Sequence, residues 1–228
     1  MEARFYHPHL DDSTTQLEGD EAMHMVKVLR MQPGDSCELC DGKGRIVRVR
    51  LMEVTKSHVG FEQLENVQVK DLRIPLHIAI APTKNMDRFE WFLEKATEMG
   101  VGRITPIQCA HSERKRLRLD RCQKILVAAM KQSQRSWLPR LDDLTPFPEF
   151  IKQKVTGIRL IAHCAEGVKN GRLVPGDASV VLIGPEGDFS PSELSSALEQ
   201  GYQALSLGTS RLRTETAGIF VAACFNQI

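Results

Sequence analysis

The sequence predicts two domains, a small β-barrel followed by an α/β domain with a mostly parallel sheet. Three observations predict this organisation. The first ~70 residues contain short strand candidates joined by tight turns. Strands and helices alternate in the rest of the chain. At 228 residues the chain is long enough for two domains, and we expect them to cover residues 1–71 and 72–228.

The expected barrel strands contain the β-branched and aromatic residues that favour extended backbone. Two of these strands flank DGKG at residues 41–44, whose glycines permit the positive φ angles of a hairpin turn. The strand candidates in chain order are ARFYH, SCELC, RIVRVRLMEV and HVGFEQLE.

The α/β domain has clear helix-end signals. Gly100 and Gly201 follow two of the expected helices, and Ser190, Pro191 and Glu193 have the spacing of a capping box. The expected strands are PLHIAIAP, GRITPIQC, IRLIAHC, SVVLIGP and ALSLG. The expected helices cover residues 87–99, 119–134 and 191–200, and a last helix ends at Cys224.

Composition favours a globular protein outside the membrane. Hydrophobic residues make up 42% of the chain and charged residues 26%, which are ordinary values. No apolar run approaches the ~18 residues of a membrane span, and MEARFYHPHLDD lacks the pattern of a signal peptide. We therefore expect a cytoplasmic protein without a membrane partner.

The six cysteines are scattered, and most lie in apolar runs, which predicts reduced core residues rather than disulfides. Cys37 and Cys40 form a CxxC motif within SCELC. Residues three apart on a strand point to opposite faces, so joint metal ligation is awkward there. We expect no metal site.

Basic residues are concentrated between residues 111 and 140, although the net charge of the chain is only +1. Such a cluster is typical of a surface that binds a polyanion. The alternative is a solvated helix face. The segment has two acidic residues, Glu113 and Asp120, and nine basic ones: Arg114, Lys115, Arg116, Arg118, Arg121, Lys124, Lys131, Arg135 and Arg140.

Two loops that follow predicted strands have unusual composition. GPEGD follows VVLI at residues 184–188, and GTSRLRTETA follows LSL at residues 208–217. Ligands of open α/β sheets bind beyond the carboxyl ends of strands, and glycine lets a ligand approach the main chain. Neither loop is a P-loop or a GxGxxG turn, and Glu186 and Asp188 favour a positively charged ligand over phosphate. GPEG could also be a plain turn between a buried strand and a capped helix.

The second loop leads into an apolar helix and contains charged residues at its start. Glu215 suits a helix N-terminus electrostatically. Arg211 and Arg213 oppose the helix dipole there and so indicate another partner. Arginine is well suited to a nucleic-acid phosphate or a base carbonyl.

IGPEGDFSPSE and, about twenty residues later, LGTSRLRTETA resemble the paired C-terminal signature of the ribosomal RNA small subunit methyltransferase E family, of the SPOUT class. FLEKATEMGVGRITPI, AAMKQSQRSWLPRL and ARFYHP resemble further segments of that family, so the likeness spans nearly the whole chain.

The resemblance implies methylation of N3 of a uridine in 16S ribosomal RNA, with S-adenosylmethionine as the methyl donor. It implies an N-terminal PUA-like β-barrel that binds RNA, and a C-terminal SPOUT α/β domain whose chain end forms a deep trefoil knot. It also implies a homodimer that acts on the small ribosomal subunit, with each cofactor site close to the partner subunit.

Carried over by position, the resemblance implies that the cofactor is held by Leu182, Gly184, Glu186, Gly187, Leu207, Gly208, Leu212, Arg213 and Thr214. From the chemistry of the reaction, we expect Arg213 to stabilise charge on a uracil carbonyl, and Glu215 to accept the proton or only to cap the last helix. From the basic segment and the basic residues outside it, we expect the RNA to be bound by Arg4, Lys84, Arg114, Lys115, Arg116, Arg135 and Arg211.

Two departures from the family pattern leave alternatives open. Asp188 stands where the family usually has a second glycine, and Thr209-Ser210-Arg211 replaces the usual Pro-Arg-aliphatic run. One alternative is an RNA-binding ribosome assembly factor with a degenerate SPOUT site. Another is a SPOUT methyltransferase that acts on a different RNA position.

Overall fold

The computed structural model describes residues 2–67, 70–163 and 171–225, and the chain divides into two compact units. One unit consists of Met1–Leu72 together with Met130–Leu138, and the other of Arg73–Ala129 together with Pro139–Ile228. The short segment Met130–Leu138 therefore belongs to the N-terminal unit. The sequence predicts two contiguous domains, residues 1–71 and 72–228, which would place this segment in the second.

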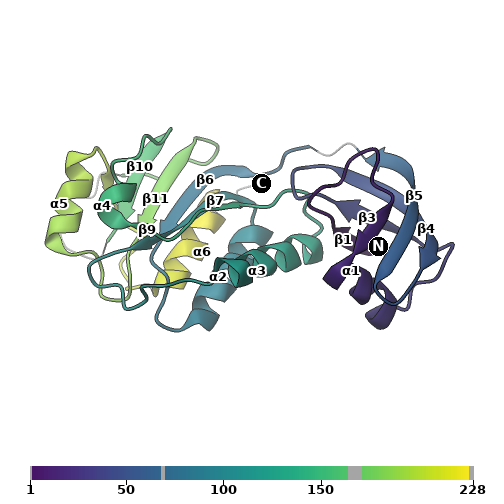
Figure 1. The fold of residues 1–228 in the computed structure, drawn as a ribbon. Coiled ribbons are helices and arrows are strands. Elements are labelled where there is room, and N and C mark those ends of the chain that lie inside the picture. Colours follow the sequence, from purple (N-terminus) through teal and green to yellow (C-terminus); the bar gives the residue numbers. More distant parts are fainter. Residues whose placement is uncertain (1, 68–69, 164–170, 226–228) are drawn as a thin grey trace. The chain divides into compact units, whose positions relative to one another are not determined.

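The first unit is a curved five-stranded sheet with a main apolar core and a second, smaller apolar cluster (Figure 1). The strand order is β1-β3-β4-β5-β2; the β1 and β3 strands are parallel, and the other neighbours are antiparallel. The strands are β1 (Arg4–Tyr6), β2 (Gln16–Glu18), β3 (Ser36–Cys40), β4 (Ile46–Val54) and β5 (His58–Val67). The sequence did not predict β2, the helix α1 (Gly19–Met23) or the π-helical turn η1 (His24–Val28), because each is at most five residues long.

The β3–β4 hairpin turns as predicted, with positive φ at Gly42 (71°) and Gly44 (98°). A Cβ at Gly44 would overlap the Trp137 ring, so this glycine also permits close packing. Cys37 and Cys40 pack into different apolar clusters, and burial raises the pKa of each thiol to about 12. Both are reduced core residues.

Arg4 attaches the returning segment Met130–Leu138 to the sheet of the first unit. Its guanidinium pairs with Glu38 at 2.7 Å and donates to the Gln134 carbonyl at 2.6 Å. The Arg4 side chain is only 8% exposed. This arrangement favours a structural role for Arg4 over the RNA contact that the sequence predicts.

The second unit is a parallel sheet with the strand order β12-β10-β11-β6-β7-β8, and β9 also pairs with β7. The strands are β6 (Ile74–Ile80), β7 (Val101–Gln108), β8 (Arg140–Leu141), β9 (Thr145–Pro146), β10 (Ile158–Ala162), β11 (Ser179–Ile183) and β12 (Gln203–Leu205). The helices are α2 (Met86–Glu98), α3 (Leu119–Gln132), α4 (Phe147–Phe150), α5 (Pro191–Glu199) and α6 (Thr214–Phe225). The predicted parallel α/β domain is confirmed, whereas β8, β9 and α4 were too short to predict.

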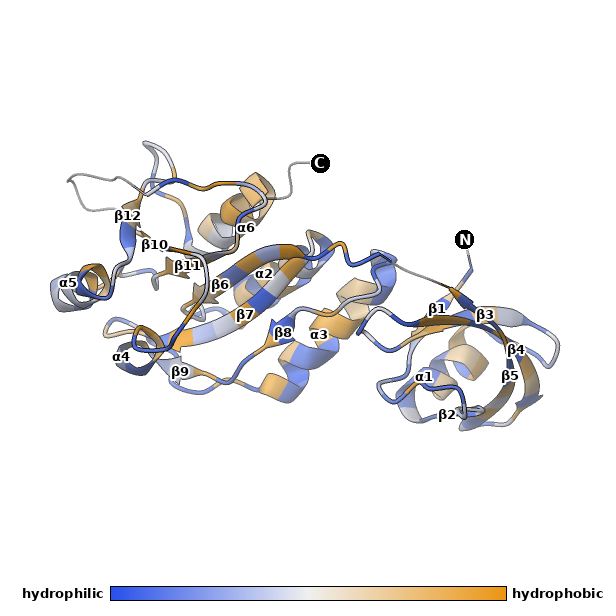
Figure 2. Ribbon diagram, turned by 90° about the horizontal axis from the view of Figure 1, so that it is seen from above, coloured by the Kyte–Doolittle hydropathy of each residue, from blue (hydrophilic) through white to orange (hydrophobic). Residues whose placement is uncertain are grey.

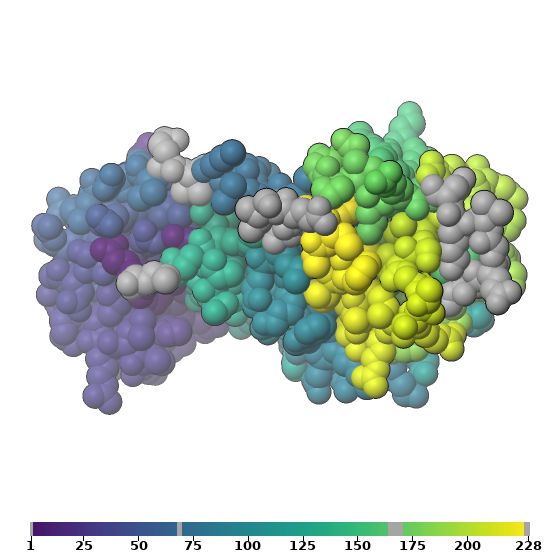
Figure 3. All heavy atoms as spheres, turned by 180° about the vertical axis from the view of Figure 1, so that it is seen from behind, coloured from purple at the N-terminus to yellow at the C-terminus, as the bar shows by residue number. Residues whose placement is uncertain are grey.

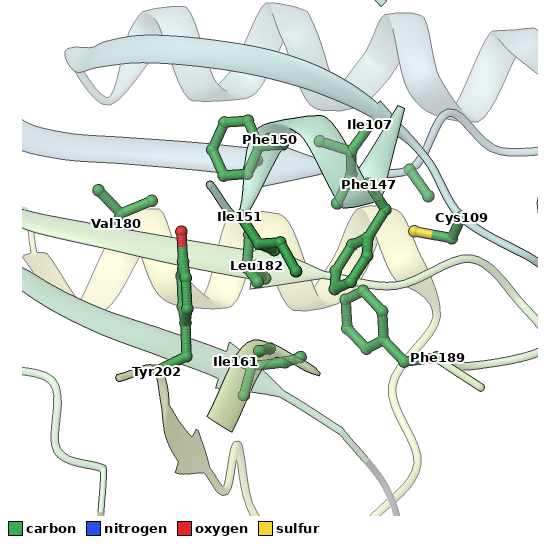
Figure 4. Packing of buried hydrophobic residues seen from close by; sticks show 13 residues of the cluster. Ile107, Cys109, Phe147, Phe150, Ile151, Ile161, Val180, Leu182, Phe189 and Tyr202 are labelled. Carbon is green, nitrogen blue, oxygen red and sulfur yellow. The ribbon is translucent and has the colours of Figure 1, made fainter. Parts of the chain in front are cut away.

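The sheet of the second unit is covered on both faces, which is why β11 is buried along its whole length. On one face, residues of α4 and α5 form a core with the strands; Figure 4 shows Phe147, Phe150 and Tyr202 in it, with α6 behind the sheet. Helices α2 and α6 pack against each other on the opposite face. A Cβ at Gly218 of α6 would lie 2.6 Å from the Phe92 ring, so glycine permits this close approach.

Helix ends follow the sequence signals. Ser190 and Glu193 form the complete capping box of α5, and Gly100 and Gly201 have positive φ (83° and 82°) beyond α2 and α5. In Figure 2, α3 carries both orange and blue residues, whereas α6 is tan to orange. Within the described residues, no helix is long and apolar enough to cross a membrane. The knot stays a prediction.

Candidate cofactor and catalytic site

Two loops leave the same edge of the second unit's sheet and meet there. The first cavity loop (residues 184–190) follows β11, and the second cavity loop (residues 206–213) follows β12. Strand β10 lies between β11 and β12, so its end also faces this edge. The buried Thr214 hydroxyl donates to the Gly184 carbonyl at 3.0 Å and joins the two loops directly.

A cavity of about 410 Å³ lies between the loops. This volume is within the usual range for small-molecule sites. Of the residues expected to hold the cofactor, the cavity is lined by Gly184, Glu186, Leu207, Gly208, Leu212, Arg213 and Thr214.

The other two expected cofactor residues do not line the cavity. Leu182 is fully buried in the core of the sheet, where it supports the first cavity loop. Gly187 is exposed on the outer side of that loop, and a Cβ there would lie 3.1 Å from the His111 side chain.

Sequence reasoning missed Ala162 and His163, which line the cavity at the end of β10. The signal was the position of IRLIAHC as a strand whose carboxyl end reaches the same edge as the two loops. The sequence alone does not give the order of the strands in the sheet. Strand β10 precedes both loops in sequence, but in the sheet it lies between the two strands that lead into them.

Asp188 adopts the left-handed conformation, with φ of 62°. This explains why a glycine is common at that position in the family that the sequence resembles. Aspartate is among the few other residues that tolerate this region. Its carboxylate accepts from the Phe189 amide at 2.8 Å, and its carbonyl accepts from His111 Nδ1 at 3.0 Å. The departure from glycine therefore leaves the turn in place.

The second cavity loop is more open. Gly208 has φ of 119°, and a Cβ built there would meet nothing within 4 Å, so a ligand can reach the main chain. Thr209, Ser210 and Arg211 are exposed. The Ser206 hydroxyl and Gly208 are joined by hydrogen bonds of 3.3–3.4 Å.

The wall of the first cavity loop is acidic. Glu186 and Asp188 line the cavity, and Glu186 Oε1 accepts from the Lys84 amide at 3.0 Å. Two carboxylates and open main chain suit a ligand that carries positive charge together with hydrogen-bonding groups.

A shallow groove of about 590 Å³ adjoins the cavity and shares Arg211, Leu212 and Arg213 with it. Glu215 also lines this groove, and its side chain is only 8% exposed. Glu215 Oε1 lies 3.8 Å from Arg88 Nε, whereas Oε2 is buried and has no hydrogen-bond partner among the described residues. The groove thus presents arginine donors beside a carboxylate oxygen that can still accept.

The residues expected to bind RNA differ in their surroundings. Lys84, Lys115, Arg116 and Arg211 are exposed. Arg114 instead donates to the Lys84 carbonyl at 2.7 Å. In the first unit, Arg4 is buried as described above, and Arg135 donates to the Leu72 carbonyl at 3.4 Å while burial lowers its pKa.

The family profile described as an RNA methyltransferase domain matches residues 70–226. The chain belongs to this family. A second profile, described as an RNA methyltransferase PUA domain, matches residues 17–62 in the first unit. The predicted PUA-like N-terminal part and α/β methyltransferase domain are confirmed.

Individual proteins of similar sequence and structure carry related names. A crystal structure of a probable rRNA-methyltransferase from Porphyromonas gingivalis has 39% identity and a TM-score of 0.87, over 97% of this chain and 95% of that one. Ribosomal RNA small subunit methyltransferase E from Neisseria gonorrhoeae, bound to S-adenosyl methionine, has 30% identity and a TM-score of 0.83 over 98% and 96%. The enzyme of that name from Synechocystis is 30% identical over 95% of this chain and 74% of its own length.

Proposed function

We propose that this protein methylates N3 of a uridine in the 16S ribosomal RNA of the small ribosomal subunit and takes the methyl group from S-adenosylmethionine. The cavity between the two cavity loops is the proposed cofactor site. Support comes from the family, from the relative of known structure that holds this cofactor, and from the shape and chemistry of the cavity. The reaction belongs in the cytoplasm, where ribosomes are assembled.

The observation that carries the proposal is the convergence of the two cavity loops on one cavity with open main chain and an acidic wall. When bound, S-adenosylmethionine supplies a methyl group on a positively charged sulfonium. Glu186 and Asp188 compensate positive charge on that side, and the open space around Gly208 lets adenine or the amino-acid end approach the main chain of the second cavity loop. The residues present therefore fit the cofactor.

Arg213 is the proposed electrophilic residue. Uracil N3 normally keeps its proton, so the enzyme must favour the anion, whose negative charge lies largely on O2 and O4. A guanidinium beside one of these carbonyls stabilises that charge as an oxyanion-hole donor does. Arg213 lines both the cavity and the groove, which is where the methyl donor and the base must meet.

Glu215 is the proposed proton acceptor. Its Oε2 atom is buried and has no partner among the described residues, so an opening of the groove on RNA binding would let it accept the N3 proton before the N3–methyl bond forms. Arg88 stays beside Oε1 and holds the carboxylate in the groove. Its position at the first turn of α6 also suits the helix dipole, so the capping role and the catalytic role are compatible.

Exposed basic residues around the cavity are the proposed contacts for RNA phosphates. Lys84, Lys115 and Arg116 lie on loops at the cavity edge of the sheet, and Arg211 lies on the second cavity loop. N3 is on the Watson–Crick edge, so the target base must be unpaired or drawn out of its stack. Binding should weaken steeply with salt.

The protein is proposed to act as a homodimer that covers the exposed side of α6. This helix is apolar all round, which is typical of a buried helix. Phe220 of α6 and Trp91 of α2 are nevertheless each 44% exposed. Figure 3 shows the yellow C-terminal segment at the surface, beside the blue-green segment that carries α2. Phe220→Asp should convert a dimer to a monomer in light scattering; a wild-type monomer at micromolar concentration would contradict the proposal.

The function is tested with purified small ribosomal subunits from a strain that lacks the modification. Incubation with methyl-labelled S-adenosylmethionine, followed by nucleoside mass spectrometry, should yield labelled 3-methyluridine. Label on a ribose or on another base would show a different target. Cofactor binding in calorimetry without any methyl transfer would favour the assembly-factor alternative.

A further inference from the structure

A third loop fixes one wall of the cofactor cavity. The arginine loop (residues 109–118) connects β7 to α3 and is basic, so its composition predicts RNA binding. Its first residues nevertheless bind the protein itself. The Ala110 amide donates to Glu193 at 2.8 Å, and His111 Nδ1 donates to the Asp188 carbonyl at 3.0 Å.

Arg114 continues this pattern. Its Nη2 atom donates to the Lys84 carbonyl at 2.7 Å, and its Nε atom donates more weakly to the Thr83 carbonyl at 3.4 Å. The Thr83 carbonyl and the Lys84 amide belong to one peptide group. The same amide donates to Glu186 Oε1 at 3.0 Å. This rigid, planar group is therefore held by Arg114 on one side and by Glu186 on the other.

Lys115 and Arg116, the next two residues, provide a contrast. Both are exposed, and neither side chain has a hydrogen bond or an ion pair within the described residues. They are available to a polyanion, whereas Arg114 is engaged with main-chain carbonyls. The planar fork of arginine donates to two neighbouring carbonyls in fixed directions, whereas lysine has one ammonium on a flexible stem and fixes their orientation less well.

We propose that Arg114 is a positioning residue for the cofactor cavity. It holds the peptide group between Thr83 and Lys84 in the orientation that fixes the Glu186 carboxylate on the cavity wall. Because Glu186 Oε1 is bound to Lys84, Oε2 is presented to the positively charged cofactor. The inference rests on the proposed cofactor site and assigns Arg114 to cofactor binding rather than to RNA binding.

The variant Arg114→Ala tests the proposal through its affinity for S-adenosylmethionine and its affinity for RNA. The affinity for S-adenosylmethionine in calorimetry should fall by about tenfold, the size expected for losing a charge-assisted hydrogen bond. Turnover at saturating cofactor should change less than threefold, and the salt dependence of RNA binding should stay as in the wild type. Arg116→Ala is the matched control, and it should weaken RNA binding without changing cofactor affinity.

Two further variants separate positioning from general stability. Arg114→Lys should restore part of the cofactor affinity, because lysine can still donate to the Lys84 carbonyl. In a double-mutant cycle, Arg114→Ala should add little to the loss caused by Glu186→Ala, since both act on one contact. If Arg114→Ala fails to fold, the test uses Arg114→Lys instead. Its affinity for S-adenosylmethionine is then measured alone and in a double-mutant cycle with Glu186→Ala.

The inference is overturned if Arg114→Ala keeps wild-type cofactor affinity, or if its only effect is a shallower salt dependence of RNA binding. Thr209→Trp separates this failure from failure of the proposed site. Thr209 is exposed and lines the cavity, so tryptophan there should block cofactor binding without disturbing the core. Normal cofactor binding by Thr209→Trp would place the cofactor elsewhere, whatever Arg114 does.

Discussion

The two cavity loops differ in how the protein holds them. The first cavity loop is fixed on several sides: His111 binds the Asp188 carbonyl, Lys84 binds Glu186, and the capping box of α5 follows directly. The second cavity loop has four consecutive exposed residues, 208–211, and is linked to the first by Thr214, the residue that follows it. The first loop is thus a preformed wall. The second loop has fewer such contacts, which suits its proposed role of contacting both cofactor and RNA.

The largest effect should come from the second cavity loop. Arg213→Ala removes the proposed donor to the uracil carbonyl, and should lower single-turnover methyl transfer by about 100- to 1,000-fold. Cofactor affinity should fall by less than about tenfold, because in the proposed site main-chain groups bind the cofactor. Arg211→Ala serves as the comparison and should weaken RNA binding more than chemistry. Equal losses of turnover and cofactor affinity would reduce Arg213 to a binding residue.

His77, which lies outside both cavity loops, should make the free energy of unfolding depend on pH. Burial and then Arg103 lower the pKa of His77 to about 4, while its ring bonds to Thr105 at 2.7 Å. The unfolded chain binds the proton more tightly, so the contribution to stability is complete above pH 6.5 and is lost as the pH falls towards 4. The free energy of unfolding should drop by about 2 to 3 kcal/mol over that range.

Urea unfolding between pH 7.5 and 4.5 checks this, with His77→Gln as the control. The variant should show a shallower pH dependence than the wild type, and parallel curves would disprove the assignment. At pH 7.5 the variant should keep the wild-type affinity for S-adenosylmethionine, because His77 lies in neither cavity loop.

The connection between the loops is tested by Thr214→Val. Valine has nearly the same shape but leaves the buried Gly184 carbonyl without its donor, which should cost about 1 to 3 kcal/mol of unfolding free energy. Cofactor affinity should fall as well, since the two cavity loops are no longer joined. Thr216→Val, an exposed change two residues later, should leave unfolding nearly unchanged. Equal unfolding free energies for the two variants would remove Thr214 from this role.

The smallest effect concerns the conformation of the first cavity loop. Asp188→Val places a β-branched residue at φ of 62° and should cost about 1 to 2 kcal/mol in thermal unfolding. Asp188→Gly should stay within about 1 kcal/mol of the wild type, since glycine adopts that conformation freely. If glycine were the more damaging change, the aspartate side-chain contacts would outweigh the backbone strain.

Local patterns predicted much of the fold. SVVLI reads as a buried strand, Ser190 as a helix cap, and the glycines at 42 and 44 as a turn, because each depends on neighbouring residues. The two cavity loops were also predictable, since glycine-rich stretches follow apolar strands. Contacts between distant residues were not predictable. His163 reaches the cavity only because β10 lies between β11 and β12.

Charge alone did not show which arginines bind the protein itself. Arg4 and Arg114 are both predicted to contact RNA, and in the structure both donate to main-chain carbonyls of distant segments. A sequence cannot distinguish a solvated arginine from one that binds a carbonyl far along the chain. Sequence pattern therefore located the cavity, whereas the roles of the charged residues around it stay predictions.

The return of Met130–Leu138 to the first unit affects how the protein is made. Met130 and Leu138 fill an apolar cluster with Cys40 and Ile46, and Arg4 binds the backbone of the same segment. A ribosome must therefore synthesise about three fifths of the chain before its N-terminal unit has all its parts. A fragment that stops at residue 72 should expose that apolar cluster and aggregate, whereas one that continues through residue 138 contains every piece of the unit.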